Sequence, residues 1–382
     1  MLFDDRFGGP PKRVYQVAQG LNAKGIATVC CYPQGDGNAP GLAQPYGVAA
    51  RRLDFERIPP LRKPLRVLGW LARLPRDIGR FRAFYRRERP DVVHVNGAVF
   101  IAAGIAARLE RYPLLWHLND VSVPWPLCRA LGWVVRRCAT RVAASVHAVA
   151  SHYGVREGRY SLLYAPVDVT RFSPRSPIAS ANASGRKLRI GTIANWNRGK
   201  GITDFVEVAA ILKRSMGDRV EFVVAGARLA TQRDYAARVD AAIAAHGLEA
   251  CMHELGFVED VAPVVATLDI VVLCSYAEAG PMVLMEAMAG GLPVVAYAAG
   301  GVRELVDAIP GCPAGYVVPI GDVGAVAQRV QQLCGDPEAR SRMGAAGRAA
   351  VEARFTLERA IVAHEQIYFS LVGRSARTAE QQ

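Results

Sequence analysis

The chain has 382 residues, of which 51% are apolar and 21% charged, the composition of a globular protein too long for one ordinary core. No apolar run reaches the ~18 residues of a membrane span, so no transmembrane helix is predicted. The net charge of +13 lies wholly in the first half, where residues 1–170 hold 25 Lys and Arg against 12 Asp and Glu. This asymmetry predicts an anionic partner, either a membrane surface, an anionic substrate or nucleic acid.

The N-terminus and the cysteines indicate the cellular compartment that we expect for the protein. The N-terminus, MLFDDRFGGPPKR, carries acids where a secretory signal would carry cations. No CxxC spacing links the cysteines, which favours reduced thiols in a cytoplasmic protein and no metal site. The eight cysteines are at positions 30, 31, 128, 138, 251, 274, 312 and 334.

In the first half, short runs rich in aliphatic and β-branched residues alternate with helical patterns, as expected for a parallel sheet with crossover helices. The predicted strands fall within residues 25–32, 90–97, 113–120 and 141–150. Residues 61–90 predict an amphipathic basic helix, or two helices divided at Pro75. Its apolar stripe comprises Leu68, Leu71, Leu74, Ile78, Phe81 and Tyr85.

Residues 172–187, rich in Ser, Ala and Pro, are interpreted as a linker. A second alternation follows, with strands within 187–195, 220–226, 251–258, 268–275 and 292–298. Helices are predicted near 201–214, 231–247 and 282–289, and over 322–371. Two such domains imply a cleft, with ligands at the carboxyl ends of the strands.

Two carboxylates mark one of these strand ends. Glu278 follows the strand within 268–275, and Glu286 lies eight residues later inside the predicted helix. Pro281 suits the first turn of that helix, whose free N–H groups favour anions. Two carboxylates there suit the recognition of sugar and ribose hydroxyls, and Gly300-Gly301 lets backbone approach a ligand. The alternative is a solvated helix edge.

The EX7E spacing of Glu278 and Glu286, with EAMAGGLPVVAYAAGGVREL and GYVVPIGD, resembles retaining nucleotide-sugar glycosyltransferases of family 4. PDVVHVNG, LLYAPVDVTRFSP, IGTIANWNRGKGITDF and ARFTLERAIVAHEQIY extend this resemblance over most of the chain. It implies the GT-B fold: α/β, two Rossmann-like domains with parallel sheets facing across a cleft, and a C-terminal helix that returns toward the first domain. The expected boundaries are 1–171, linker 172–187, 188–355 and a helix and tail at 356–382.

The resemblance also implies a reaction and its residues. A sugar would pass from a nucleotide diphosphate to an acceptor hydroxyl with retained anomeric configuration, in bacterial-type polysaccharide or glycolipid assembly. The expected catalytic residues are Glu278 at the transferred sugar, His117 near the donor sugar and Lys200 at the diphosphate. The expected donor-binding residues are Glu286 at the ribose, with Arg198, Asn195, Gly280, Pro281, Met282, Val283, Gly8 and Gly9 near the diphosphate. Without a DxD motif, no metal or other cofactor is expected, and protein groups would neutralise the diphosphate.

Two departures from the family pattern stand out. Family members usually carry an arginine where this chain has Asn195, and we hypothesise that Arg198 restores the cation beside Lys200. The family opens with a strand before the Gly-Gly pair, but only MLFD precedes DRFGGP here, so the first strand is expected to be truncated. Of the other histidines, His94 fits a core-facing strand position equally well, and His147 and His152 fit surface or packing positions.

The basic segment 61–90 favours contact with an anionic membrane surface, which suits a lipid-linked acceptor. It contains no nucleic-acid-binding motif, so no nucleic-acid partner is predicted. We therefore expect a nucleotide-sugar donor, a glycan or lipid-linked acceptor, and a cytoplasmic protein, with a peripheral position on the inner face of the membrane left open. UDP-sugars and GDP-mannose both stay open as donors. The alternatives are a non-catalytic GT-B scaffold or binding protein, a nucleotide-sugar epimerase and a nucleic-acid binder.

Overall fold

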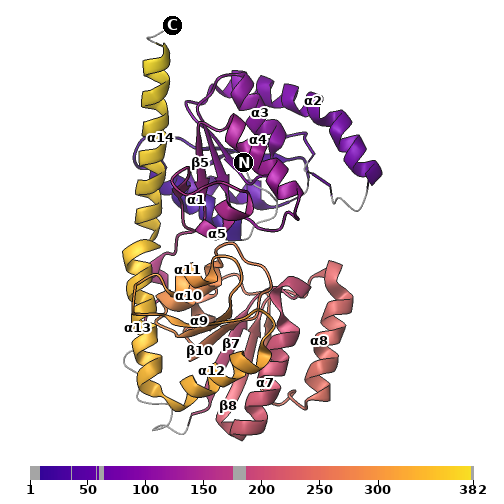
Figure 1. Cartoon of the computed structure of the whole chain (residues 1–382), viewed down its shortest axis with the longest axis vertical. Coiled ribbons are helices and arrows are strands. Elements are labelled where there is room, and N and C mark those ends of the chain that lie inside the picture. The colour runs from indigo at the N-terminus through magenta and orange to yellow at the C-terminus, as the bar shows by residue number, and fades with distance from the viewer. Residues whose placement is uncertain (1–8, 36, 57, 60–63, 175–185, 380–382) are drawn as a thin grey trace. The chain divides into compact units, whose positions relative to one another are not determined.

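The computed structural model describes residues 9–35, 37–56, 58–59, 64–174 and 186–379 (Figure 1). The chain divides into two compact units. We call Met1–Pro166 with Leu357–Gln382 the N-terminal unit, and Val167–Thr356 the C-terminal unit. Both are built from parallel strands and helices, which confirms the predicted α/β class.

The N-terminal unit holds two parallel sheets. Strand β1 pairs with β2, and a separate four-stranded sheet has the order β3-β4-β5-β6. Its helices are α1 (Gly9–Asn22), α2 (Pro64–Glu88), α3 (Ile101–Leu109), α4 (Leu127–Cys138), α5 (His147–His152) and α14 (Leu357–Ala379). Its strands are β1 (Val29–Pro33), β2 (Ala49–Leu53), β3 (Val93–Asn96), β4 (Leu114–Leu118), β5 (Arg141–Ala144) and β6 (Ser161–Leu162).

Helix α14 covers one face of the four-stranded sheet, as the predicted returning helix should. In β3 and β4, His94 pairs in register with Leu115 and Asn96 with His117, so these side chains share a face. Leu115 packs in one core with Ile367 and other residues of α14. On its other side α14 packs against α1, where a Cβ on Gly20 would lie 2.1 Å from Ile361 Cδ1. Gly20 therefore leaves room for the Ile361 side chain between the two helices.

The N-terminal unit differs from the predicted elements in two places. The run 141–150 is not one strand, because β5 ends at Ala144 and α5 begins at His147. Strand β2 was not predicted, since its sequence AARRL lacks a run of β-branched residues. The expected truncated first strand and Gly8 lie outside the described residues, and Gly9 begins α1.

The basic segment forms a single helix, α2, with Pro75 inside it. Its C-terminal half belongs to the core, where Phe81 and Tyr85 are buried. At the N-terminal end of α2 the predicted apolar stripe does not face a core, because Leu68 and Leu71 are exposed, as is Leu65. Local acids offset much of the arginine repulsion: the pairs are Arg73 with Glu56, Arg76 and Arg80 with Asp54, and Arg82 and Arg86 with Glu110.

The C-terminal unit has one six-stranded parallel sheet in the order β12-β11-β10-β7-β8-β9. Central strands such as β8 and β10 are nearly continuous apolar runs because helices cover both faces. The strands are β7 (Leu188–Ile193), β8 (Val220–Ala225), β9 (Met252–Gly256), β10 (Ile270–Leu273), β11 (Val294–Tyr297) and β12 (Gly315–Val318). The helices are α7 (Ile202–Met216), α8 (Arg233–Ala245), α9 (Ala262–Val265), α10 (Met282–Ala289), α11 (Val302–Val306), α12 (Val323–Gly335) and α13 (Pro337–Arg354).

The segment at residues 167–172, which was predicted to be the end of the first domain and the start of the linker, lies in the C-terminal unit. Val167 N–H donates to the Phe355 carbonyl over 2.8 Å. Arg348 on α13 donates to the carbonyls of Phe172 and Ala289. These bonds fasten the start of the predicted linker to the C-terminal unit, and residues 175–185 lie outside the described chain.

Candidate active site

Lys200 and Glu278 meet at the carboxyl edge of the six-stranded sheet. Strands β7 and β10 are parallel neighbours, so the loops that follow them emerge at the same edge. Lys200 ends the short 3-10 turn Arg198–Lys200 after β7, and Glu278 lies in the loop between β10 and α10. Lys200 Nζ donates to Glu278 Oε1 over 2.6 Å, and Glu278 is only 7% exposed. A nearly buried carboxylate is thus held by a more exposed cation.

Two glycines fix the backbone of the loop that carries Glu278. Gly300 has φ +53°, and a Cβ there would lie 1.6 Å from the Glu278 carbonyl oxygen. Gly201 has φ +62°, and its Cβ would lie 2.0 Å from the Cys274 carbonyl oxygen. The N–H of Gly301 also donates to Ala279 over 3.1 Å. Gly300 and Gly301 thus lie against the protein's own loop, and the expected approach of their backbone to a ligand stays a prediction.

Helix α10 begins beside Glu278. Pro281 is its N-cap, one residue before the helix and not within its first turn. Met282 and Val283 are the first two helical residues, and N–H groups at this end of a helix have no partner inside it. They give the edge a partial positive charge suited to an anion. Glu286 lies one turn farther along α10 and is half-buried.

Asn195 and Arg198 differ in what they offer a ligand. The side-chain oxygen of Asn195 accepts a hydrogen bond of 2.9 Å from the N–H of Ala227, which ties the ends of β7 and β8 together. Gly226, with φ +154°, allows that approach, since a Cβ there would meet Ala194. Arg198 is exposed, and no acid of the described chain pairs with it. Arg198 is therefore a cation beside Lys200 that is not engaged within the unit.

One carboxylate that stabilises the loop carrying Glu278 was not predicted from the sequence. Asp204, in the first turn of α7, accepts hydrogen bonds of 2.7 Å from the hydroxyls of both Tyr276 and Tyr297. The bond to Asp204 is the main reason that the pKa of Tyr276 rises to about 12. Tyr276 N–H also donates to Gly199 over 2.9 Å. No local motif links these residues, because the two tyrosines lie 72 and 93 positions from Asp204.

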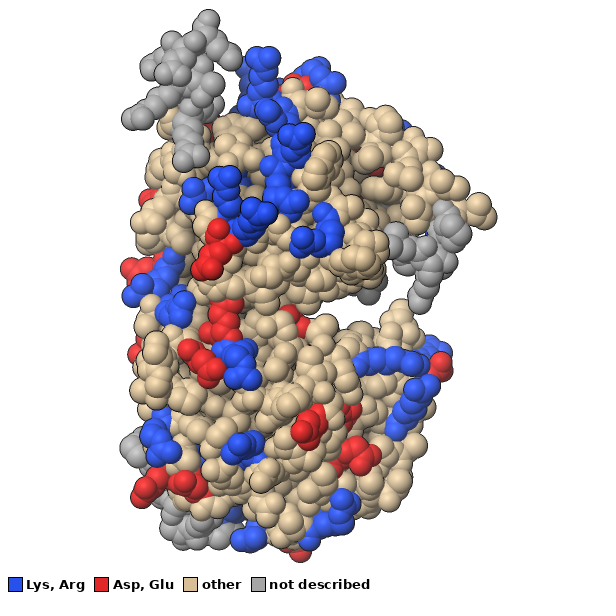
Figure 2. Space-filling view, in the orientation of Figure 1, with Lys and Arg blue, Asp and Glu red and all other residues tan. Residues whose placement is uncertain are grey.

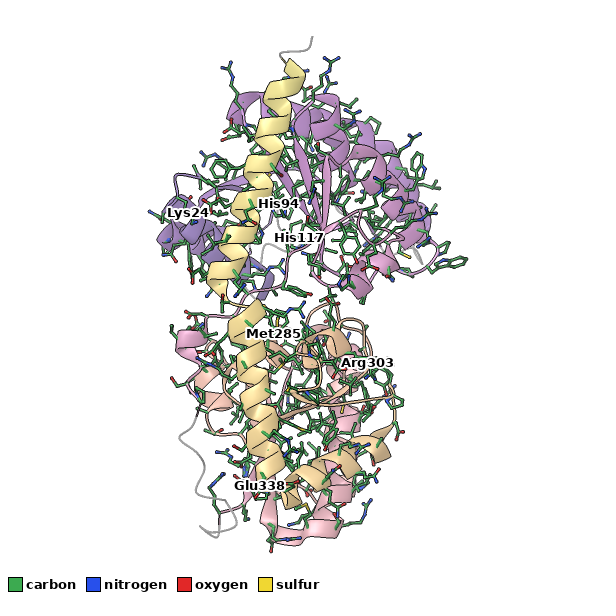
Figure 3. All side chains as sticks on the ribbon, turned by 60° about the vertical axis from the view of Figure 1, so that its left-hand side comes forward. Lys24, His94, His117, Met285, Arg303 and Glu338 are labelled. Carbon is green, nitrogen blue, oxygen red and sulfur yellow. The ribbon has the colours of Figure 1, made fainter. Side chains whose placement is uncertain are left out.

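In the N-terminal unit, His117 and His94 lie together beside α14 (Figure 3). Their ring centroids are 5.6 Å apart, and His117 is 3% exposed. Burial lowers the pKa of both rings well below the ordinary value, so both are neutral near pH 7. Of the remaining histidines, His152 bonds the Val123 carbonyl and His147 bonds Tyr160. The structure thus joins His117 to His94, which the sequence gave little reason to single out.

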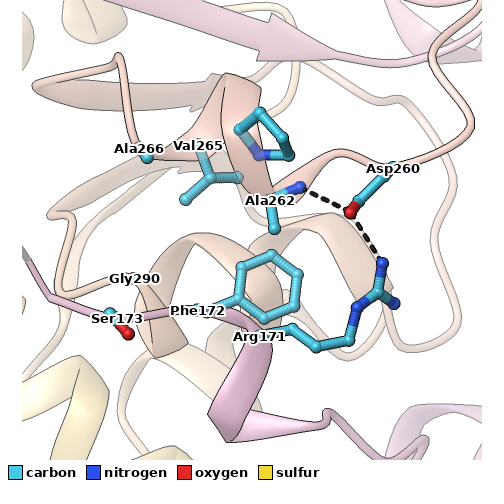
Figure 4. A pocket seen from close by; sticks show the side chains of 9 residues that line it. Arg171, Phe172, Ser173, Asp260, Ala262, Val265, Ala266 and Gly290 are labelled. Carbon is cyan, nitrogen blue, oxygen red and sulfur yellow. Dashed lines mark hydrogen bonds and ion pairs between the residues drawn. The ribbon is translucent and has the colours of Figure 1, made fainter.

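A cavity of about 330 Å³ in the C-terminal unit lies away from these groups (Figure 4). Gly290, at the far end of α10 from Pro281, is part of its lining, so it faces the opposite edge of the sheet. Phe172 lines it, and Arg171 pairs with Asp260 over 2.7 Å at its side. None of the predicted site residues lines this cavity.

No group of three or more His, Cys, Asp or Glu side chains in the described residues has the geometry to hold a metal ion. Within the same residues, no helix is long and apolar enough to cross a bilayer.

Comparisons with known proteins agree with this architecture. Residues 178–350 match the family model described as glycosyl transferases group 1, and residues 8–154 match that of a glycosyl transferase 4-like domain. The crystal structure of Anabaena Alr3699/HepE in complex with UDP has a TM-score of 0.75 and 20% identity, covering 99% of this chain and 98% of that chain. At that identity the likeness shows the fold alone.

Two curated relatives illustrate the range of similarity. N-acetyl-alpha-D-glucosaminyl L-malate synthase of Bacillus anthracis is 33% identical over 31% of this chain and 30% of that protein. The lipopolysaccharide core biosynthesis mannosyltransferase LpcC of Rhizobium leguminosarum bv. viciae is 29% identical over 75% of this chain and 80% of that protein. Several relatives match over only 30% to 52% of their own length. The two family models follow one another along nearly the whole chain, and the protein belongs to the group 1 glycosyltransferases with the GT-B fold.

Proposed function

We propose that the protein is a retaining glycosyltransferase that moves a sugar from a nucleotide-diphosphate donor to an acceptor hydroxyl in polysaccharide or glycolipid assembly. The observation that carries the proposal is the Lys200–Glu278 pair beside the start of α10, at the ligand-binding edge of a parallel sheet. Relatives named for amylovoran and lipopolysaccharide core biosynthesis support a glycan or lipid-linked acceptor. A relative named as GDP-mannose-dependent and a structure in complex with UDP keep both nucleotides open.

The cations would act on the leaving group. Negative charge grows on the departing diphosphate as the glycosidic bond breaks, so nearby positive groups stabilise the transition state more than the ground state. Lys200, the exposed Arg198 and the first N–H groups of α10 supply positive charge at one edge. These groups would neutralise the diphosphate without a metal ion, while Asn195 supports the loop through its bond to Ala227.

The carboxylates would bind hydroxyls. When the diphosphate draws Lys200 away, Glu278 loses its partner and becomes an acceptor for hydroxyls of the transferred sugar. Glu286, farther along α10, would hold the ribose. His117 would contact the donor sugar through Nε2, for which the described residues offer no hydrogen-bond partner. Gly8 and Gly9 are included in the proposal as residues near the diphosphate.

Release of nucleoside diphosphate from UDP- and GDP-sugars, with EDTA present, tests this function. We expect Lys200→Met to reduce kcat/KM about 100-fold or more, since a charge that acts on the leaving group is lost. Lys213→Met is the matched control, because Lys213 pairs with Asp218 on the surface of the same unit. Product release that stops in EDTA and returns with Mg²⁺ would contradict metal independence. Nucleotide binding without any turnover would favour the non-catalytic alternative.

We further propose that the N-terminal part of α2 holds the protein on an anionic membrane surface, which would place it at the inner face of the membrane. Leu65, Leu68 and Leu71 are 83%, 61% and 48% exposed, at three-residue spacings on one helix. Among the charged residues visible on the N-terminal unit, Lys and Arg outnumber Asp and Glu, whereas the C-terminal unit shows both signs (Figure 2). Exposed leucines among cations suit the boundary between headgroups and acyl chains.

Flotation with vesicles tests the membrane contact. We expect binding to vesicles that contain phosphatidylglycerol, weak binding to pure phosphatidylcholine, and loss of binding in Leu65→Ser with Leu68→Ser. Leu255→Ser serves as control, since Leu255 is also exposed but lies in the C-terminal unit. Equal binding of the double variant and the wild type would contradict the proposed surface.

A further inference from the structure

The guanidinium of Arg228 lies over a buried tryptophan at the carboxyl edge of the six-stranded sheet. Its central carbon is 4.1 Å from the centre of the Trp196 ring, and Trp196 is 0% exposed. Trp196 follows β7 and Arg228 follows the neighbouring strand β8, where the two residues form a parallel bridge. A cation over the face of a tryptophan is attracted by the negative charge of that face. The ends of the two strands are therefore joined by a side-chain stack as well as by their backbones.

Two carboxylates hold the side chain that stacks on Trp196. Nε of Arg228 donates to Glu254 on β9 over 2.6 Å. Its two terminal nitrogens donate to Asp240 on α8 over 2.7 and 2.8 Å. The fork of a guanidinium is planar, so bonds to two carboxylates from different elements leave it little freedom to turn. We call Arg228, Asp240 and Glu254 the clamp.

The indole of Trp196 has no hydrogen bond that sets its orientation. Buried tryptophans usually bond through the ring N–H, but Nε1 of Trp196 is buried and finds no partner among the described residues. The ring packs into the core of the C-terminal unit on one side and meets the guanidinium of Arg228 on another. Without the clamp, packing alone would orient the ring.

This ring belongs to the loop that carries the two cations of the proposed site. Trp196 lies two residues before Arg198 and four before Lys200. Beyond Arg198 the loop has a second attachment, because the N–H of Tyr276 donates to the Gly199 carbonyl over 2.9 Å. The stretch with the cations is thus short and held at two points, one of which is the stack under Arg228.

We propose that Arg228 is a positioning residue: through Trp196 it holds the loop with the two cations in the geometry that meets the diphosphate. Arg228 does not itself bind the diphosphate, because the two carboxylates of the clamp outweigh its charge. The clamp side chains are 33% to 49% exposed, so their ion pairs contribute little to folding stability and act mainly by orienting the guanidinium. The effect on the diphosphate rests on the proposed function, whereas the attachment of the loop does not.

The kinetic test removes the clamp without changing the local charge. The clamp holds one cation and two carboxylates, a net charge of −1, and Arg228→Met with Asp240→Asn leaves Glu254 as the single charge. We expect this double variant to reduce kcat/KM for release of nucleoside diphosphate about 10-fold, because small misplacements of catalytic groups are costly. In a Lys200→Met background the further loss should shrink to about threefold or less, since the clamp acts through the loop that carries Lys200.

Arg186→Met is the matched control. Arg186 bonds Asp269 over 2.6 and 2.9 Å where β7 and β10 begin, at the amino edge of the same sheet. Asp269 is 2% exposed, so this control should lower the midpoint of unfolding while kcat/KM stays unchanged. The double variant should show the reverse, a lower kcat/KM with nearly the same midpoint. A loss in the Lys200→Met background as large as in the wild type would overturn the proposal.

Hydrogen exchange of backbone amides provides a readout that needs no substrate. The N–H of Trp196 donates to the Ala227 carbonyl over 2.9 Å, and it should exchange about 10-fold faster in the double variant but not in Arg186→Met. Arg228→Lys keeps the charge but loses the fork, so its exchange rate should be intermediate. Unchanged exchange in the double variant, or faster exchange with full kcat/KM, would contradict the positioning role. If no nucleotide sugar is turned over while exchange still depends on Arg228, the proposed function fails and the attachment of the loop stands.

Discussion

At the scale of single residues, Lys200, Glu278 and Asp204 each have a partner within the C-terminal unit. Lys200 and Glu278 neutralise one another across 2.6 Å, and Asp204 takes two tyrosine hydroxyls below them. The sequence motif predicts roles for Lys200 and Glu278 at the diphosphate and the transferred sugar, and these roles stay predictions. It could not predict that the two are paired, nor that Asp204 supports them, because hydrogen bonds between distant positions leave no local pattern.

Glu278→Gln should separate donor binding from chemistry. The amide keeps the size of the side chain but no longer competes with the diphosphate for Lys200. We therefore expect the dissociation constant for UDP or GDP to stay equal or fall, while kcat drops about 100-fold. Calorimetric titration and initial rates give the two numbers, with the exposed Glu249→Gln as control. A large rise in the dissociation constant with unchanged kcat would assign Glu278 to nucleotide binding instead.

At the scale of elements, parallel strand ends and glycines bring the site together. Strands made of β-branched runs, such as β8, β10 and β11, and helices such as α7 and α10 were predicted close to their observed positions. The two elements that were predicted wrongly have physical causes. Helix α5 continues an apolar run that looks like one strand, and the exposed end of α2 keeps a helical apolar stripe without a core beneath it.

Gly300 and Gly311 test the glycine contacts as a matched pair. Both have positive φ, +53° and +74°, but a Cβ on Gly300 meets the Glu278 carbonyl whereas one on Gly311 meets nothing within 4 Å. Gly311→Ala should cost only the conformational strain of about 1 kcal/mol. Gly300→Ala should destabilise by at least about 2 kcal/mol more and weaken nucleotide binding, as judged by denaturation curves and titration. Equal losses for both variants would mean that the loop with Glu278 adapts freely.

At the scale of the whole molecule, the last helix of the chain completes the first unit. Helix α14 closes the core over β4 and supplies His364 to a buried cluster with His94 and His117. The returning helix was predicted from the family resemblance. The cluster was not, because it joins His94, His117 and His364 from three separate segments.

The burial of His364 predicts a sensitivity to acid. Burial lowers its pKa to about 4 in the folded protein, below the ordinary 6.5, so the unfolded chain binds more protons between these values. The free energy of unfolding should therefore fall as pH drops from 6.5 toward 4, by up to about 3 kcal/mol from this group. In His364→Gln the decline over this window should be shallower, whereas His253→Gln, at an exposed site, should match the wild type. Parallel curves for wild type and His364→Gln would contradict the assignment.

The proposed function depends most on a nucleotide-sugar site in the C-terminal unit, with Glu286 at the ribose. The direct measurement is thermal unfolding of the full chain with UDP-, GDP-, ADP- and TDP-sugars, without added metal. We expect one nucleotide class to raise the midpoint of unfolding, and we expect Glu286→Ala, but not Glu249→Ala, to lose this shift. No shift with any of the four classes, or a shift of full size in Glu286→Ala, would contradict it.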